Sequence, residues 1–398
     1  MSETAIDIAI IGGGLVGASL AVALGPLIER HQLRVAVIEA SELSASGAQP
    51  SFDERSSAIA YGSRAHFETM ELWSQLATRA APIHDIEVSQ RGAMGRTHLS
   101  RRDAGTPSLG YVLPNAFLGR VLHERLADMA IDWHCPARVD RMTPEPDGHR
   151  LVLDSGQTLH AGLTVLADGG RSGLKASLGI ATDRHDYEQH ALIANVETAH
   201  AHEGWAFERF TDEGAMALLP LTQRRMALIW TRPPESIDAT LAMSDDDFLL
   251  ALQSRMGSRL GRFQRVGSRH VYALSMSRAR EQSRPHLAVL GNAAHAIHPI
   301  AGQGFNLALR GVMDLNAAIE AALDAGRTPG EAATMADFEQ RRQRDRDLIM
   351  QASDTLVRLF GLELPGISGV RGAALGLFNL ATPLKRALIR RAMGLARH

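Results

Sequence analysis

The sequence predicts an α/β protein that combines a parallel sheet, covered by helices, with a separate antiparallel sheet. An apolar segment over 6–11, a glycine-rich turn and a helical stretch over 18–27 follow one another, the order in which a parallel sheet begins. Similar strand and helix signals return over 110–180. Between 186 and 275, apolar and polar residues alternate, which favours antiparallel strands.

The glycine-rich turn matches the pattern GxGxxG of dinucleotide-binding proteins. In that pattern the first glycine permits a tight turn, the second lets a pyrophosphate approach the backbone, and the third lets the helix pack closely on the strand. A second apolar strand over 34–38 then ends in an acidic residue, where a carboxylate can accept hydrogen bonds from an adenosine ribose. The predicted contacts are Gly12, Gly14, Val16, Gly17 and Glu39.

Composition excludes several classes of protein. The 398 residues are 45% hydrophobic and 22% charged, as in a globular protein with a large core. The formal net charge of −2 provides no basic field for nucleic acid, so no nucleic-acid partner is expected. The single cysteine, Cys135, excludes an intramolecular disulfide. Acidic Glu3 and Asp7 argue against an export signal, and we expect a cytoplasmic protein, with peripheral contact at the inner membrane as an open alternative.

Two later segments sharpen the choice of dinucleotide. LTVLADGGRSGLK, over 163–175, is a strand that ends in Asp168-Gly169, and GNAAHAIHPIAGQGFNLAL, over 291–309, exposes much backbone. With the first turn, in this order and spacing, they resemble the single-component, FAD-dependent aromatic hydroxylases. The resemblance implies a Rossmann-like FAD-binding domain of the p-hydroxybenzoate hydroxylase type, with an inserted antiparallel substrate sheet.

The resemblance also implies a set of further FAD contacts. A helix N-terminus within 299–306 would place amide hydrogens and a partial positive charge against the edge of the reduced flavin. Two departures from the family pattern are Asn292 in place of Asp, and Lys175 in place of Arg, which keeps the charge without the bidentate fork. The implied contacts are Arg55, Arg120, Asp168, Gly169, Gly291, Asn292, Pro299, Gly302, Gln303, Gly304, Phe305 and Asn306.

Three stretches indicate a branch of this family. FDERSSAIAYGS over 52–63, HEGWAFERFTDEGAMALLPL over 202–221 and HPIAGQGFNL over 298–307 resemble the hydroxylases of ubiquinone biosynthesis, and HCP over 134–136 is similar to those acting on 2-polyprenyl-6-methoxyphenol. The resemblance implies a polyprenyl phenol substrate, NAD(P)H as a transient reductant, and O₂, which adds at the flavin C4a position to form the hydroxylating hydroperoxide.

Some questions of function stay open at this point. No side chain is assigned as a catalytic acid or base, and the backbone near Pro299 is the expected contact of the reacting ring. A sibling hydroxylase for another ring position, a flavin reductase and a non-catalytic scaffold subunit remain alternatives. Other ubiquinone-biosynthesis proteins are candidate partners.

The expected domain division follows these segments. The FAD-binding domain is expected over 1–75, 110–185 and 275–345, the substrate sheet over 76–109 and 186–274, and a basic helical segment over 346–398. A sheet laid over the flavin would cover the substrate, so we expect aromatic and apolar strand residues in the pocket wall, with plain core as the alternative for each. The candidates are Phe207, Phe210, Leu219, Pro220 and Trp230.

The C-terminal segment is basic and amphipathic. After Glu363 no acidic residue occurs, so this segment suits either an anionic bilayer surface or packing on the FAD domain with a solvated basic face. The basic residues are Arg371, Lys385, Arg386, Arg390, Arg391 and Arg397. His295 and His298 have the spacing of metal ligands, but Pro299 argues against the helix that this spacing requires, and we expect no metal site.

Overall fold

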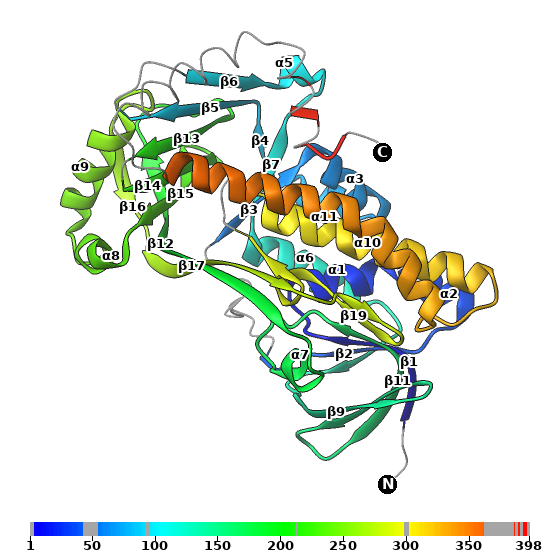
Figure 1. Ribbon diagram of the computed structural model, residues 1–398. Coiled ribbons are helices and arrows are strands. Elements are labelled where there is room, and N and C mark those ends of the chain that lie inside the picture. Colours follow the sequence, from blue (N-terminus) through cyan, green and yellow to red (C-terminus); the bar gives the residue numbers. More distant parts are fainter. Residues whose placement is uncertain are drawn as a thin grey trace.

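The computed structural model has the α/β architecture that the sequence predicts, with two large sheets and two long helices (Figure 1). It describes residues 4–42, 55–91, 96–211, 213–297 and 302–361, together with 386, 389–390 and 393–395.

The first sheet has five parallel strands at its centre. Strands β19 (Leu287–Val289), β11 (Thr158–Leu166), β1 (Thr4–Ile11), β2 (Val35–Ile38) and β8 (Ile131–His134) lie side by side in this order. The apolar run over 6–11 and the second run over 34–38 thus form the strands that the sequence predicts. The antiparallel strands β9 (Val139–Glu145), β10 (Gly148–Leu153) and β18 (Ser283–Arg284) complete the sheet.

Helices cover one face of this sheet because the central strands are apolar on both sides. The expected helix over 18–27 is in fact two helices, α1 (Leu15–Ala23) and α2 (Gly25–His31), since Pro26 begins a new helix. Leu20 of α1 is fully buried, as are Ile8 and Ile10 of β1. The same core includes residues of α3 (Tyr61–Thr69), α6 (Asn115–Ala127), α10 (Gln303–Asp324) and α11 (Ala332–Gly361).

The second sheet has nine strands, six of them from the segment expected to alternate. It contains β5 (Asp85–Gln90), β6 (Arg96–Ser100), β12 (Thr182–Thr198), β13 (Trp205–Thr211), β14 (Gly214–Pro220), β15 (Arg225–Arg232), β16 (Phe263–Val266), β17 (His270–Ala279) and β20 (His295–Ala296). Strand β12 begins at Thr182, four residues before the segment expected to alternate, because its polar first half pairs only with β17 and shows no alternation. The short helices α8 (Pro234–Leu241) and α9 (Asp245–Met256) contribute to the core on one face.

A small third sheet packs against both large sheets. It consists of β3 (Ser56–Ala60), β7 (Gly110–Pro114) and β4 (Ala81–Ile83). Ile83 and Val112 of this sheet pack in one cluster with Ala206 and Ala227 of the nine-stranded sheet. Ile59 belongs to the core of the first sheet, so this small sheet joins both cores. The remaining elements are α4 (Trp73–Leu76), α5 (Arg101–Ala104), α7 (Leu174–Ser177) and the 3₁₀ turn η1 (Gly291–Ala293).

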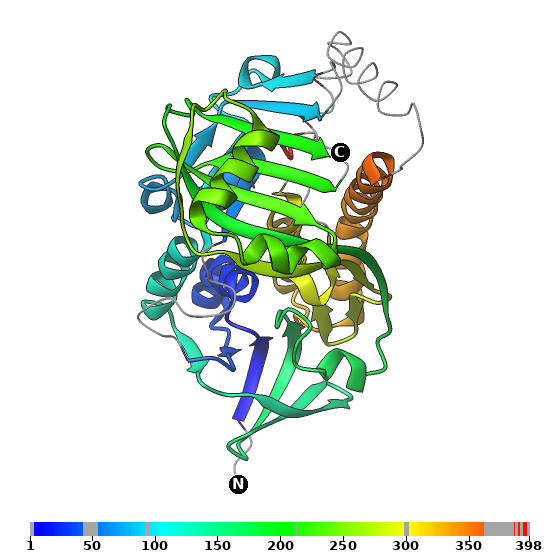
Figure 2. The same cartoon turned by 90° about the vertical axis from the view of Figure 1, so that its left-hand side faces the viewer.

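Figure 2 shows the green strands of the nine-stranded sheet in its upper part and the parallel sheet below them. The domain division stays a prediction, and two placements bear on it. Strands β5 and β6 from 76–109 pair in the nine-stranded sheet, as the division expects. Strand β20, from the segment assigned to the FAD-binding domain, pairs with β17 of the nine-stranded sheet.

The described part of the C-terminal segment packs on the protein. Ile389 and Met393 are 2% and 3% exposed in the cluster that joins the small sheet to the nine-stranded sheet. Gly62 N donates a hydrogen bond of 2.8 Å to Met393 O. Arg386 and Arg390 are exposed. The side chains of Ile389 and Met393 therefore serve packing. Among the described helices, none has the length and hydropathy to cross a membrane.

Candidate FAD and substrate site

Four predicted contacts follow four parallel strands at one edge of the first sheet. Gly12 follows β1, Glu39 follows β2, Asp168 comes shortly after β11, and Asn292 comes shortly after β19. Strands β19, β11, β1 and β2 are parallel neighbours, so their carboxyl ends lie at the same edge. Open α/β sheets bind ligands outside this edge.

The first glycine turn is shaped by close backbone contacts. Gly12 has φ of +106°, and a Cβ there would lie 2.7 Å from Ala167 O. A Cβ on Gly17 would lie 1.8 Å from Gly12 O, because α1 starts directly against the end of β1. Neither position accepts a side chain. The N-terminus of α1 is therefore held against the strand end, where its free amide groups can face a pyrophosphate.

Glu39 closes the other side of this turn. Its two carboxylate oxygens accept hydrogen bonds from Gly13 N at 2.7 Å and Ser41 N at 2.8 Å. His123 of α6 supports the same turn from outside, since its Nε2 lies 2.9 Å from Gly13 O and donates to it. Burial lowers the pKa of His123, which keeps this imidazole neutral near pH 7. Sequence reasoning missed His123, because nothing near position 123 relates it to a turn 110 residues earlier.

The Asp168 turn arranges its own backbone. Asp168 accepts hydrogen bonds from Gly170 N at 3.0 Å and Ser172 N at 2.7 Å, and Gly169 has φ of +71°. Lys175 donates from Nζ to Ala293 O at 2.8 Å, which ties this turn to the 3₁₀ turn η1. Burial lowers the pKa of Lys175, although Asp168 opposes the shift. Asn292, within η1, is exposed and available to a ligand.

The late glycine segment is seated by long-range contacts. Gly291 has φ of +59°, and a Cβ there would lie 2.9 Å from Val16 Cγ2, so the segment reaches the first turn. Gly302 has φ of +60°, and a Cβ there would lie only 2.9 Å from Ala58 Cβ. Asn306, 1% exposed, accepts from Ala60 N at 2.7 Å and donates to Ala58 O at 2.7 Å and Gly302 O at 3.0 Å.

These contacts define what Asn306 and Phe305 do in the fold. The Asn306 amide joins the start of α10 to β3, and Phe305 stacks on Phe67 with ring centroids 6.5 Å apart. Both side chains thus serve packing, and their predicted FAD contact remains one through the backbone. Gly304 has ordinary space around it, with Ile297 Cγ1 3.8 Å from an added Cβ. Pro299 and His298 lie outside the described residues, as does the side chain of Gln303.

The two predicted arginines lie in different settings. Arg55 is half-buried directly before β3, with its guanidinium 4.8 Å from the ring centroid of Tyr272 in the nine-stranded sheet. Arg120 is exposed on α6, 5.6 Å from the ring centroid of Phe117. Arg55 therefore lies where the strand β3 approaches the nine-stranded sheet, whereas Arg120 is on the outside of a helix. Both remain predicted FAD contacts.

The residues at this edge fit FAD. The first turn excludes any Cβ at Gly12 and Gly17, which leaves bare backbone and a helix N-terminus for the pyrophosphate. Glu39 places a carboxylate at the end of the second strand, as a ribose requires. Asn292, shortly after β19 and two strands away from β1, offers an exposed amide that can bond a hydroxyl.

The predicted pocket residues divide between the two faces of the nine-stranded sheet. Phe207 and Trp230 are 6% and 1% exposed in the core under α8 and α9, and this favours the alternative of plain core for both. Pro220, two residues after Leu218 of that core, shares their face. Leu219 and Phe210 lie on the opposite face.

That opposite face also presents apolar residues that the sequence did not single out. Ile193, Ile229 and Ala217 are neighbours across β12, β15 and β14, and all three are half-buried. Tyr272, which contacts Arg55, lies one step along on the same face. Leu219 on this face packs against the same apolar cluster as Ala58, the neighbour of Gly302. The face is therefore directed toward the predicted flavin segment, and strand alternation together with pairing register would have identified it.

One group could hold a metal ion by geometry, but its own contacts account for it. The ligand atoms of Glu145, Asp147 and His160 lie within 4.8 Å of one another. His160 Nε2 is 3.2 Å from Asp147 and 3.4 Å from Glu145, and Arg150 pairs with Glu145 at 2.6 Å. Glu145 and Asp147 lie on the β9–β10 hairpin and His160 near the start of β11, away from the strand ends that carry the predicted FAD contacts.

Comparison with known proteins places the chain. The family model described as "FAD binding domain" matches residues 5–351. The ubiquinone hydroxylase UbiL of Rhodospirillum rubrum is 35% identical over 99% of this chain and 90% of its own length. The 3-demethoxyubiquinol 3-hydroxylase of Escherichia coli is 28% identical over 99% of this chain and 100% of its own length. The crystal structure of p-nitrophenol 4-monooxygenase PnpA from Pseudomonas putida covers both chains fully, with a TM-score of 0.80 at 18% identity.

These matches agree with the geometry of the edge. A family model over most of the chain, together with a relative above 30% identity along nearly its whole length, confirms the resemblance found in the sequence. The α/β fold is confirmed as well. The chain therefore belongs to the FAD-dependent aromatic monooxygenases, in the family of the ubiquinone-biosynthesis hydroxylases.

Proposed function

We propose that this enzyme hydroxylates the ring of a polyprenyl phenol, 2-polyprenyl-6-methoxyphenol, with NAD(P)H as transient reductant and O₂ as co-substrate. The observation that carries the proposal is the full-length similarity to a ubiquinone hydroxylase, combined with a half-buried apolar sheet face that is directed toward the FAD edge. That face offers Ile193, Ile229 and Ala217 to an apolar ring and chain.

When bound, FAD supplies the redox chemistry that activates O₂. The chain's own residues bind and orient: the first glycine turn and Glu39 hold the adenosine and pyrophosphate half, and Asn292 bonds the ribityl chain. The N-terminus of α10, fixed to β3 by Asn306, directs a partial positive charge toward the ring edge, where reduction places negative charge. The apolar sheet face excludes water from the reacting ring.

A second candidate is hydroxylation at another position of the same ring. It is favoured by the similarity to an enzyme named for 3-demethoxyubiquinol over the whole chain. Both candidates share the apolar wall and differ in how the ring's oxygen substituents are oriented. Glu208 lies on the same sheet face as Ala217 and is half-buried, so it is a candidate to hold a ring hydroxyl.

We further propose the predicted domain division, the FAD contacts named from the sequence, and contact with an anionic bilayer through basic residues such as Arg386 and Arg390. The exposure of these two side chains supports the bilayer contact. Other ubiquinone-biosynthesis proteins are the proposed partners.

The test is oxidation of NADH and NADPH by the FAD-loaded protein in air, with short-chain 2-prenyl-6-methoxyphenol or a 3-demethoxyubiquinol in parallel. Product mass and H₂O₂ are followed together. Substrate-stimulated turnover that adds one oxygen atom to the first compound supports the main proposal, and addition only to the second supports the alternative. NAD(P)H oxidation without oxygen insertion into either compound would indicate a reductase, and FAD binding without oxidation a scaffold.

A further inference from the structure

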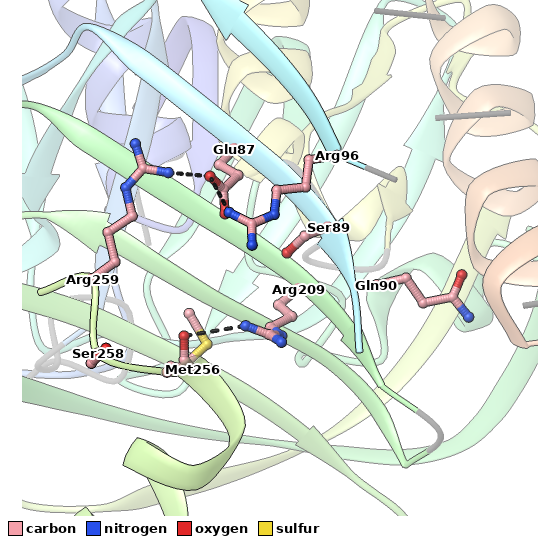
Figure 3. A pocket seen from close by; sticks show the side chains of 9 residues that line it. Glu87, Ser89, Gln90, Arg96, Arg209, Met256, Ser258 and Arg259 are labelled. Carbon is pink, nitrogen blue, oxygen red and sulfur yellow. Dashed lines mark hydrogen bonds and ion pairs between the residues drawn. The ribbon is translucent and has the colours of Figure 1, made fainter. Parts of the chain in front are cut away.

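A cavity of about 550 Å³ lies at the outer end of the nine-stranded sheet, away from the predicted FAD contacts. Its wall consists of β5, β6, β13 and the end of α9 with the segment that follows (Figure 3). In the strand register, Arg209 of β13 lies opposite Ser89 of β5, and Ser89 lies opposite Arg96 of β6. These three side chains therefore share the face that α8 and α9 cover. The cavity therefore opens opposite to the proposed substrate face.

The wall is rich in positive charge. It contains Arg96, Arg209 and Arg259, with Glu87 as the one acidic residue among the nine that line it. Glu87 pairs with Arg259 and, at 3.8 Å, with Arg96, and Figure 3 shows it between these two guanidinium groups. One carboxylate thus serves two arginines and leaves the third without an acidic partner in the wall.

Arg209 is the third arginine of the wall, the one without a salt bridge to Glu87. Its NH1 donates to Met256 O at 3.2 Å, and its buried Nε has no hydrogen-bond partner among the described residues. Burial lowers the pKa of Arg209, and the nearby charges of Arg96 and Arg91 lower it further, while Glu87 opposes the shift. A buried guanidinium nitrogen without an acceptor is costly, so an anion in the cavity would relieve a cost that the protein otherwise bears.

The cavity is also prepared for a ligand. Arg259 is fixed by Glu87 and by Trp205, whose ring centroid lies 4.1 Å from its guanidinium carbon. Arg209 is fixed by Met256 O, so little side-chain freedom would be lost on binding. Hydroxyl donors come from Ser89 and Ser258. Guanidinium forks and hydroxyls match an anion with several acceptor oxygens on one atom, which is the geometry of phosphate.

From these observations we propose that this cavity binds a phosphate-bearing anion, either a diffusible phosphate ester or the headgroup of an anionic phospholipid. The proposal does not depend on the reaction at the flavin, because no lining residue is among the predicted FAD contacts.

The test uses the full-length, FAD-loaded protein and inorganic pyrophosphate in a calorimetric titration. Saturable binding is expected, weakened at least about 10-fold by Arg209→Gln and by Arg96→Gln, because each removes a charge-assisted hydrogen bond. Arg224→Gln is the matched control, since Arg224 lies in the turn before β15, does not line the cavity, is 53% exposed and pairs with Glu197 at 3.5 Å. Arg96 is 67% exposed, so its variant tests the proposal even if the Arg209 variant fails to fold.

A second arm distinguishes the source of the phosphate. The protein is sedimented with phosphatidylcholine vesicles that contain or lack phosphatidylglycerol. Binding to the anionic vesicles that pyrophosphate displaces and that Arg96→Gln weakens identifies a headgroup, whereas pyrophosphate binding without vesicle binding identifies a diffusible ester. No saturable pyrophosphate binding at millimolar concentration, or equal weakening in Arg224→Gln, would overturn the proposal.

Discussion

The two glycine-rich segments of the FAD edge are built in different ways. The turn over 12–17 is defined by backbone that leaves no room for side chains, since Gly17 lies against Gly12 O and Gly12 against Ala167 O. The described parts of the second segment, at Gly291 and from Gly302 to Asn306, are instead held by contacts with distant parts of the chain. Its Asn306 side chain bonds β3, 246 residues earlier in the sequence.

This difference shows how one edge combines two kinds of rigidity. In the first turn, the contact of Gly17 with Gly12 O lies within one strand and helix, so it forms with the local structure, whereas the contact of Gly12 with Ala167 O also requires β11. The side-chain bonds of the second segment exist only after β3 and α10 have come together. A substitution in the first turn should therefore act through steric overlap, and one in the second through lost hydrogen bonds or lost space for the cofactor.

The largest effect is expected from Gly17→Ala. An added Cβ would lie 1.8 Å from Gly12 O, so α1 must move away from β1. We expect FAD affinity to fall at least about 100-fold, with roughly 3 kcal/mol lost from the free energy of unfolding. FAD retained after gel filtration and urea unfolding measure the two effects. Gly267→Ala is the control, because its Cβ would lie 3.6 Å from Asn195 O; equal behaviour of the two variants would contradict the steric account.

Asn306→Leu should destabilise the protein by about 3 kcal/mol, because it leaves Ala60 N and Ala58 O buried without their partner. Urea unfolding of the two proteins gives the difference. Asn316→Leu in the same helix is the matched control, since the Asn316 Oδ1 has no hydrogen-bond partner in the described part of the chain. We expect less than about 1 kcal/mol there. An equal loss in the free energy of unfolding for Asn316→Leu and Asn306→Leu would show that the hydrogen bonds from Asn306 to β3 do not hold α10 in place.

Acid should weaken the fold through His295, which follows the second segment's 3₁₀ turn. Burial, together with Arg342, Arg346, Arg310 and Arg278, lowers its pKa from 6.5 to about 3. The native imidazole stays neutral while the unfolded one binds a proton, so the free energy of unfolding falls as the pH drops from about 6.5 toward 3. The slope reaches about 1.4 kcal/mol per pH unit for this group.

Unfolding of wild type and His295→Gln at pH 7 and pH 5 measures this contribution. The loss between the two pH values should be smaller in the variant by up to about 2 kcal/mol. His149, whose pKa is lowered to about 4 mainly by burial, keeps its own contribution in both proteins. Equal losses in the two proteins would show that His295 is not held neutral by the fold.

The smallest effect is expected from Gly304→Ala. The nearest atom to its added Cβ is Ile297 Cγ1 at 3.8 Å, so the fold accepts the methyl group and α10 should gain about 0.5–1 kcal/mol from a better helix former. If the backbone here faces the flavin, FAD affinity should fall roughly 10-fold while the unfolding of the FAD-free protein is unchanged or improved. Unaltered FAD affinity would place the ring edge elsewhere.

The sequence predicted most of the edge because its parts follow strands. Gly12, Glu39 and Asp168 were located from apolar runs that end in turn residues, and the structure brings their strands together as parallel neighbours. The substrate sheet was predicted from alternation, but the faces of its residues were not. Phe207 and Phe210 are three positions apart in one strand and therefore lie on opposite faces, one in the core under α9 and one toward the small sheet.

By itself, then, the sequence determined the fold class and the first turn, because these depend on glycine sterics and strand periodicity within short stretches. The kind of cofactor followed from the resemblance of three segments to the FAD-dependent aromatic hydroxylases. Only the tertiary structure decided that Asn306 seats α10 on β3 and that His123 supports the first turn. It also gathered Arg96, Arg209 and Arg259 around one cavity. These contacts join residues far apart in the chain, and the pairing of distant segments is fixed by packing of the whole core rather than by any local pattern.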